Sequence, residues 1–257
     1  LKLNTTGTQN VAVGAASLDA NTTASEGTAV GWNSLSSNTT GASNVAVGKS
    51  ALSSNTTAAN NTAVGTSALG ANTTGDLNTA VGYSAGGANT TGARNTFIGA
   101  SVAPSNTTGN YNTGVGGRGS DNYNVLNNNT TGSQLAAFGV GTLGRNTSGI
   151  DNTAIGAYAL NKNTTASNNT AVGRSALYSN TTGGQNTALG NEALATNSTG
   201  INNAASGYRA LYLNTTGGNN SAFGKYALRS TTTGGYNTAV GAGAGEALTT
   251  GIQNTLI

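Results

Sequence analysis

The chain has 257 residues, with ten basic and seven acidic side chains and a formal net charge of +3. So few basic residues exclude the dense positive stripe that a nucleic-acid-binding surface needs. The absence of cysteine and histidine excludes disulfides, thiolate metal sites and the commonest metal ligand and general base. No long apolar run is present, so we expect no membrane-spanning segment.

A seventeen-residue repeat organises the whole chain, with the consensus N-T-T-G-x-x-N-T-A-V-G-x-x-A-L-x-x. Repeats begin at residues 4, 21, 38, 55, 72, 89, 106, 129, 146, 163, 180, 197, 214, 231 and 248, and the one longer step marks a six-residue insertion. A fixed period of this size predicts a solenoid. We therefore predict an all-β fold, a parallel β-solenoid (β-roll) of about fifteen 17-residue coils. It forms a single domain over residues 1–257.

Positions in the repeat are numbered here from its first asparagine. Positions 7 to 11, N-T-A-V-G, predict a short strand because threonine and valine are β-branched. Ala-Leu at positions 14 and 15 begins a second predicted strand, and N-T-T-G forms a corner. We expect two short strands per coil, coils about 4.8 Å apart and a rod roughly 70 Å long. Asparagines at positions 1 and 7 are expected to stack and hydrogen-bond between coils.

The charges indicate which positions face water. Sixteen charged residues occupy positions 5, 6, 12, 13, 16 and 17, and the remaining one, Asp121, lies in the insertion. Valine at position 10 and leucine at position 15, such as Val81 and Leu69, are predicted to point inward. Alternation along the strand then places the alanines of position 9 on the opposite face, as a flat surface for self-association, most simply as a trimer. This predicted face comprises Ala12, Ala29, Ala46, Ala63, Ala80, Ala154, Ala171, Ala188 and Ala239.

The segments N-T-A-V-G-Y-S-A (78–85) and N-T-A-I-G-A-Y-A-L (152–160) resemble the repeats of phage tail-fibre-type proteins. They are also similar to the shorter S-V-A-I-G repeats in the heads of trimeric autotransporter adhesins, from which the seventeen-residue unit departs in length. The resemblance implies a parallel β-roll, usually trimeric, outside the cell or on a virion.

Both ends of the repeat array lack a polar capping segment, because Leu1 enters at position 15 and Ile257 leaves at position 10. Uncapped solenoids expose strand edges that can pair with another copy. We therefore expect end-to-end contact through Leu1, Leu3, Leu256 and Ile257.

The insertion, residues 117–125, places Arg118, Asp121 and Tyr123 in a Gly/Asn-rich loop. It is either a recognition loop or a tolerated surface loop. Around it, Gly86, Ala103 and Ser120 stand where position 15 expects leucine.

The Asn-Thr-Thr corners match the acceptor pattern for N-glycosylation, although asparagine and threonine also suit the turn by themselves. The candidate acceptors are Asn4, Asn21, Asn38, Asn55, Asn72, Asn89, Asn106, Asn163, Asn180 and Asn214.

These patterns predict a non-enzymatic structural protein without cofactors or metals, because no catalytic pair or triad can be assembled from scattered acids alone. We expect a building block of an extracellular or virion fibre that acts by rigidity and self-association. A receptor- or glycan-binding adhesin is the alternative, with Trp32, Tyr83, Tyr208 and Tyr226 facing outward, although they occupy different coils and form no cluster. A threonine ladder also resembles the flat faces of ice-binding solenoids, which makes ice binding a weaker third hypothesis.

Overall fold

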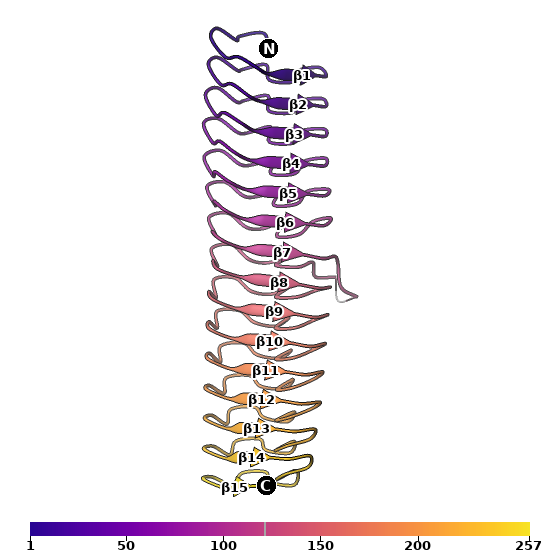
Figure 1. Cartoon of the computed structure of the whole chain (residues 1–257), viewed down its shortest axis with the longest axis vertical. Coiled ribbons are helices and arrows are strands. Elements are labelled where there is room, and N and C mark those ends of the chain that lie inside the picture. The colour runs from indigo at the N-terminus through magenta and orange to yellow at the C-terminus, as the bar shows by residue number, and fades with distance from the viewer. Residues whose placement is uncertain (121) are drawn as a thin grey trace. The chain divides into compact units, whose positions relative to one another are not determined.

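The computed structural model describes residues 1–120 and 122–257, and across them it is an all-β, parallel β-solenoid, as predicted. Each repeat contributes one three-residue strand, except for the last strand, which has two residues, and the chain loops back between strands (Figure 1). The described residues include no helix of the length and apolarity that crossing a membrane requires.

Two compact units make up the structure: residues 1–118 with 124–133, and residues 119–123 with 134–257. The single-domain organisation of the chain stays a prediction. The first unit contains β1 (Val11–Val13), β2 (Thr28–Val30), β3 (Val45–Val47), β4 (Thr62–Val64), β5 (Thr79–Val81), β6 (Thr96–Ile98) and β7 (Thr113–Val115). The second contains β8 (Ala136–Phe138), β9 (Thr153–Ile155), β10 (Thr170–Val172), β11 (Thr187–Leu189), β12 (Ala204–Ser206), β13 (Ser221–Phe223), β14 (Thr238–Val240) and β15 (Thr255–Leu256).

Within each unit, every strand pairs in parallel with the next strand along the chain, one full repeat further on. Ala63 of β4 lies beside Ala80 of β5, which in turn lies beside Phe97 of β6. The same register holds from β8 to β15, so equivalent repeat positions stack on one another throughout each unit.

The predicted second strand is wrong, because the chain turns at positions 13 and 15. Ser67 and Leu69 have φ values of 57° and 49°, in the left-handed region, and the other repeats follow the same pattern. A left-handed backbone costs a non-glycine residue about 1–2 kcal/mol. Full burial of a leucine side chain contributes about 1.5–3 kcal/mol, and Leu69 is completely buried, so burial offsets the cost of the turn.

The core is built from leucine at position 15 and alanine at positions 9 and 14. Leu69, Ala63 and Ala68 are all completely buried, whereas Val81 at position 10 is 37% exposed. The prediction that valine points inward and alanine outward is therefore wrong. Side chains do alternate between the two faces of the strand, but position 9 faces the core and position 10 faces outward, which is the reverse of the prediction. The narrow coil leaves room for alanine opposite the leucine and not for valine.

The prediction that the position-9 alanines form an exposed face for self-association is therefore also wrong. Eight of its members are completely buried in the core: Ala29, Ala46, Ala63, Ala80, Ala154, Ala171, Ala188 and Ala239. Ala12, in the first strand, is partly buried. A buried methyl group cannot contact a second chain.

Exceptions to the consensus compensate for one another across neighbouring turns. Gly86 replaces the leucine of position 15, and Phe97 replaces the alanine of position 9 in the next repeat. A Cβ atom at Gly86 would lie 2.7 Å from Phe97 Cδ2, so the phenylalanine ring fills the space of the missing leucine. Gly245 and Leu256 repeat the arrangement, with a Cβ atom at Gly245 2.5 Å from Leu256 Cδ1.

The insertion leaves the core intact. Leu126 is completely buried and has a φ of 53°, like the leucines of position 15 in other repeats. The expectation that Ser120 replaces this leucine is wrong, because the extra residues precede positions 14 and 15 and Val125 and Leu126 restore them.

Two buried asparagine ladders run through the turns, as predicted. At position 1, Asn72 Nδ2 donates to Asn55 Oδ1 at 3.0 Å and to the Gly75 carbonyl at 3.0 Å. At position 7, the Asn78 backbone N–H donates to Asn61 Oδ1 at 2.9 Å. The side chains thus satisfy buried polar groups of their own turn and of the adjacent turn, which is the condition for burying amides without large cost.

Candidate functional site

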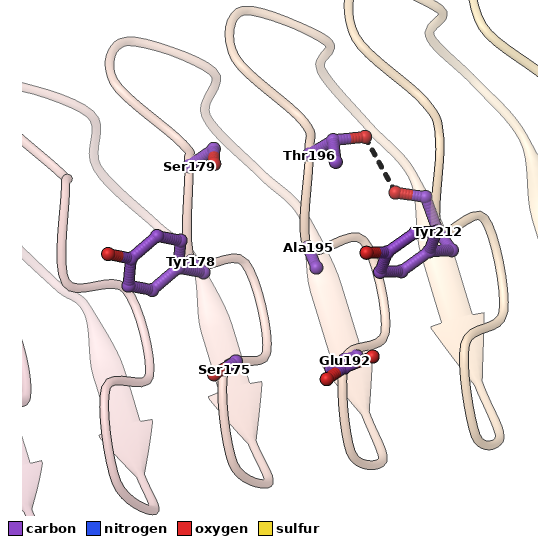
Figure 2. A pocket seen from close by; sticks show the side chains of 7 residues that line it. All are labelled: Ser175, Tyr178, Ser179, Glu192, Ala195, Thr196 and Tyr212. Atoms are coloured by element: carbon purple, nitrogen blue, oxygen red, sulfur yellow. Dashed lines mark hydrogen bonds between the residues drawn. The ribbon is translucent and has the colours of Figure 1, made fainter.

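A shallow groove on the second unit brings tyrosine, hydroxyl and carboxylate side chains together. Its volume is about 190 Å³. Seven residues line it: Ser175, Tyr178, Ser179, Glu192, Ala195, Thr196 and Tyr212 (Figure 2). They occupy positions 13, 16 and 17 of three successive repeats, so the stacking of the solenoid places them side by side.

The groove exists because position 16 carries tyrosine, alanine and tyrosine in three successive repeats. Tyr178, Ala195 and Tyr212 each follow the buried leucine of position 15, and Ala195 lies between the two rings (Figure 2). Lys162 Nζ lies 4.9 Å from the Tyr178 ring centroid, a cation–π distance. Ala195 carries only a methyl group where its two neighbours in the column carry rings, and this difference leaves the space of the groove, which we also call the slot.

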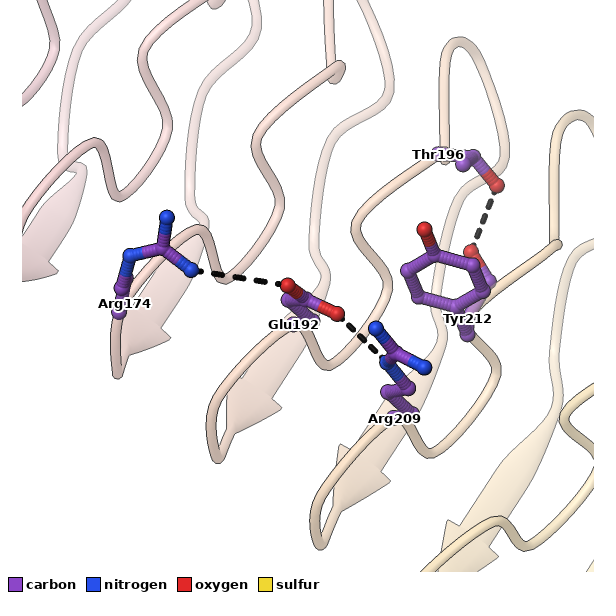
Figure 3. Close-up of polar contacts among 5 residues, drawn as sticks. All are labelled: Arg174, Glu192, Thr196, Arg209 and Tyr212. Atoms are coloured by element: carbon purple, nitrogen blue, oxygen red, sulfur yellow. Dashed lines mark hydrogen bonds and ion pairs between the residues drawn. The ribbon is translucent and has the colours of Figure 1, made fainter.

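A carboxylate held between two guanidinium groups forms the rim of the groove. Glu192 Oε2 accepts a hydrogen bond of 2.6 Å from Arg209 Nε, and Glu192 Oε1 lies 3.6 Å from Arg174 Nη1 (Figure 3). The Arg209 guanidinium also lies 5.0 Å from the Tyr212 ring centroid and 5.1 Å from that of Tyr208. These contacts fix the orientation of Arg209 beside the slot.

The hydrogen bond to Glu192 raises the pKa of Arg209 above its ordinary value, and desolvation opposes this effect. Arginine is already protonated at any working pH, so the consequence is positional and leaves the charge unchanged. On the other rim, Thr196 Oγ1 donates to the Tyr212 carbonyl at 2.6 Å, which ties two turns together beside the groove (Figure 2).

Sequence reasoning missed the groove because it treated the outward aromatic residues singly. Of the four that it named, Tyr208 and Tyr226 are in contact, with ring centroids 5.4 Å apart and planes at 56°. The inference that these residues form no cluster is therefore wrong for this pair. A comparison of the same position in successive repeats would have indicated the groove. Tyr178 and Tyr212 share position 16 two repeats apart, and stacking of the repeats brings such residues close together.

A second feature, the aliphatic stripe, consists of the position-10 side chains on the outer face of the sheet. In the first unit its most exposed members are Val13, Val47, Val64, Val81 and Ile98, at 36–57% exposure. The second unit carries its own stripe, with Phe138, Ile155, Leu189, Phe223 and Val240 at 38–47%. Position 8, mostly threonine, points the same way and is partly exposed in most repeats.

The predicted recognition loop is divided between the units. Arg118 belongs to the first unit and is exposed, and Asp121 lies outside the described residues. Tyr123 belongs to the second unit, where the Arg145 guanidinium lies 4.7 Å from its ring centroid. Ser120 is held by Tyr158, whose hydroxyl lies 2.6 Å from the Ser120 backbone nitrogen. A recognition role for the loop stays a prediction.

The predicted N-glycosylation sites are wrong for the folded chain, with the exception of Asn4, which is exposed. The other nine asparagines are at most 1% exposed, and their Nδ2 groups donate the ladder hydrogen bonds. An attached glycan would have to replace these bonds inside the core.

The predicted end-to-end contacts are exposed to different extents. Leu1, Leu3 and Ile257 are exposed, whereas the Leu256 side chain packs toward Gly245. Contact between copies through these residues stays a prediction.

The groove is suited to binding. It offers two aromatic rings, three hydroxyl side chains and one carboxylate, with a positioned guanidinium beside them. Within the described residues, no three His, Cys, Asp or Glu side chains gather as metal ligands. Absence of enzymatic activity stays a prediction.

No family model, curated protein or solved structure matches the chain.

Proposed function

We propose that this chain is a structural building block of an extracellular or virion fibre, and that it acts by rigidity and self-association rather than by catalysis. The observation that carries this proposal is the pair of asparagine ladders, which bond neighbouring turns to one another inside the core of each unit. Six of the seventeen positions of the repeat are buried in most turns, and the ladder asparagines occupy two of these six.

We expect each unit of the solenoid to be rigid because bending it would break hydrogen bonds between neighbouring turns. Separating two turns disrupts the strand pairing, the backbone bond from the position-7 asparagine and the Asn–Asn bond of position 1 together. A buried hydrogen-bonding group left without its partner costs about 1–3 kcal/mol. Several such groups lie between neighbouring turns within each unit, so we expect each unit to be a stiff element that transmits load along its stacking direction.

Self-association would use the aliphatic stripe in place of the buried alanines. Burying the exposed part of a valine contributes about 0.5–1.5 kcal/mol, since full burial is worth 1.5–3 kcal/mol. The five most exposed residues of the first unit then supply roughly 3–7 kcal/mol, against an association cost of about 4–15 kcal/mol. We therefore expect concentration-dependent rather than obligatory association.

Sedimentation velocity at low and high protein concentration tests the proposal. We expect wild-type protein to form larger species at high concentration, and a Val64→Lys/Val81→Lys variant to remain small because charges on the stripe resist burial. Thr66→Lys/Tyr83→Lys is the matched control, since it adds two lysines in the same two repeats at position 12, which already carries lysine at Lys49 and Lys225. Wild-type protein that stays monomeric at every concentration would contradict self-association.

The same sheet face favours ice binding as a second candidate. Position 8 places Thr62, Thr79 and Thr96 in a row beside Val64, Val81 and Ile98, without charge on either row. Measurement of thermal hysteresis in the purified protein tests this function. A freezing point equal to the melting point rejects it.

A further inference from the structure

We propose that the groove between Tyr178 and Tyr212 is a saccharide-binding subsite that accepts one pyranose ring of a glycan. This function goes beyond the structural role, because it needs three repeats of the second unit and not the stripe or the ladders. The structural role and this subsite can therefore fail independently.

The first argument is the shape of the slot. Tyr178 and Tyr212 are two turns apart, which at about 4.8 Å per turn separates their attachment points by nearly 10 Å. Ala195 forms the floor between them. The volume of about 190 Å³ corresponds to about six water molecules at ~30 Å³ each, so the slot suits one small ring and not a drug-sized ligand.

The second argument is the chemistry of the walls. Aromatic side chains present an apolar body and a polar tip, which matches a sugar ring with its C–H faces and its hydroxyl edge. The hydroxyl groups of Ser175, Ser179 and Thr196 and the carboxylate of Glu192 surround the slot. Hydroxyl groups donate and accept and the carboxylate accepts, so a ligand rich in hydroxyls can satisfy them.

The third argument excludes other ligand classes. A phosphate or sulfate in the groove would lie against the Glu192 carboxylate, and the Arg209 and Arg174 guanidinium groups that could attract an anion are already paired with that carboxylate. A purely apolar ring would remove the Ser175 and Ser179 hydroxyl groups from water without replacing their hydrogen bonds to it, at a cost of about 1–3 kcal/mol for each group. A neutral saccharide avoids both penalties.

The fourth argument is preorganisation. The Arg209–Glu192 bond, the two tyrosine rings beside Arg209 and the Thr196 bond to the Tyr212 carbonyl hold the rim in place. Groups that are fixed before binding lose little conformational entropy when a ligand arrives. The solenoid backbone on both sides of the slot supplies the same rigidity to Tyr178 and Tyr212.

The test is Ala195→Tyr in the full chain, which fills the slot by completing the tyrosine column. The fold should tolerate it, because tyrosine occupies the same position in both adjacent repeats, and the tilted contact of Tyr208 with Tyr226 shows that adjacent turns accommodate neighbouring tyrosine rings. A microarray of neutral oligosaccharides identifies the tightest saccharide for wild-type protein, and calorimetric titration with that saccharide gives the affinity. We expect Ala195→Tyr to abolish binding, with an unchanged circular dichroism spectrum and melting temperature.

Removal of one ring by Tyr178→Ala or Tyr212→Ala should weaken binding by roughly tenfold, equivalent to 1.4 kcal/mol. Tyr178→Phe should bind nearly as well as wild type, since it keeps the ring. Tyr83→Ala and Tyr236→Ala, which remove highly exposed tyrosines elsewhere, should leave the affinity unchanged. The proposal is overturned if wild-type protein binds no saccharide on the array, or if Ala195→Tyr binds as wild type does.

Discussion

At the scale of single residues, side-chain volume decides which way the strand faces. A three-residue strand has only two ways to present alternate side chains, and both alanine and valine are apolar. The space opposite the buried leucine accepts alanine, and it accepts Phe97 only where Gly86 has removed the leucine. Steric fit therefore outweighs the greater hydrophobicity of valine.

The Gly86–Phe97 pair predicts strong coupling between two substitutions. Gly86→Leu alone should destabilise the protein by about 1–3 kcal/mol through overpacking against Phe97. Phe97→Ala alone should cost about 3–5 kcal/mol because it leaves a cavity. The double variant recreates the Leu69/Ala80 arrangement and should recover most of both losses. Urea unfolding followed by circular dichroism measures all three, and a double variant less stable than either single one would contradict this packing.

The pH dependence of the Arg209–Glu192 pair follows from the raised pKa of Arg209. A group whose pKa is raised by folding contributes stability that is fully present below its unfolded pKa and is lost as pH rises through its folded pKa. For arginine this loss occurs only in strongly alkaline solution. We therefore expect the difference in melting temperature between wild type and Arg209→Gln to stay constant from about pH 6 to 9. A difference that disappears within this range would show that another group controls the pair.

At the scale of the turn, the asparagine ladder links each repeat to its neighbours. The ladder also shows what happens where it ends: Thr231 replaces the asparagine that would follow Asn214, and Asn214 Oδ1 is buried without a hydrogen-bond partner. One substitution in the sequence thus leaves an unsatisfied group in the adjacent turn.

Asn180→Ala should therefore destabilise the protein by about 2–4 kcal/mol, since it removes the bonds to Asn163 and Gly183 and the acceptor used by Asn197. Asn191→Ala, in the same repeat but exposed, is the matched control and should change stability by less than about 0.5 kcal/mol. Thermal and urea unfolding compare the two variants. Equal losses would mean that the ladder contributes no more than a surface amide.

At the scale of the whole molecule, a repeat array depends on its register and much less on its number of turns. Deletion of residues 38–54 removes one period and joins equivalent positions. We expect this variant to keep its circular dichroism spectrum and cooperative melting. Deletion of residues 38–45 leaves a nine-residue remnant, residues 46–54, that cannot complete a turn, and the register is broken at this junction, so we expect a clearly lower melting temperature than for the first deletion. Equal behaviour of the two deletions would contradict a fold held by stacked repeats.

The sequence by itself determined the solenoid, its seventeen-residue period, the asparagine ladders and the water-facing positions of the charges. Each of these follows from periodicity, because identical residues recurring at one interval must stack. The glycosylation pattern misled, because a three-residue motif says nothing about whether Asn72 is buried.

Only the tertiary structure decided that Val81 faces outward, that Leu69 occupies a turn rather than a second strand, and that Tyr178 and Tyr212 border a groove. The physical reason is that these features depend on the space between segments. The size of the coil interior, the left-handed turns and the gap above Ala195 arise from contacts between residues at different repeat positions or in different turns, which periodicity alone does not measure.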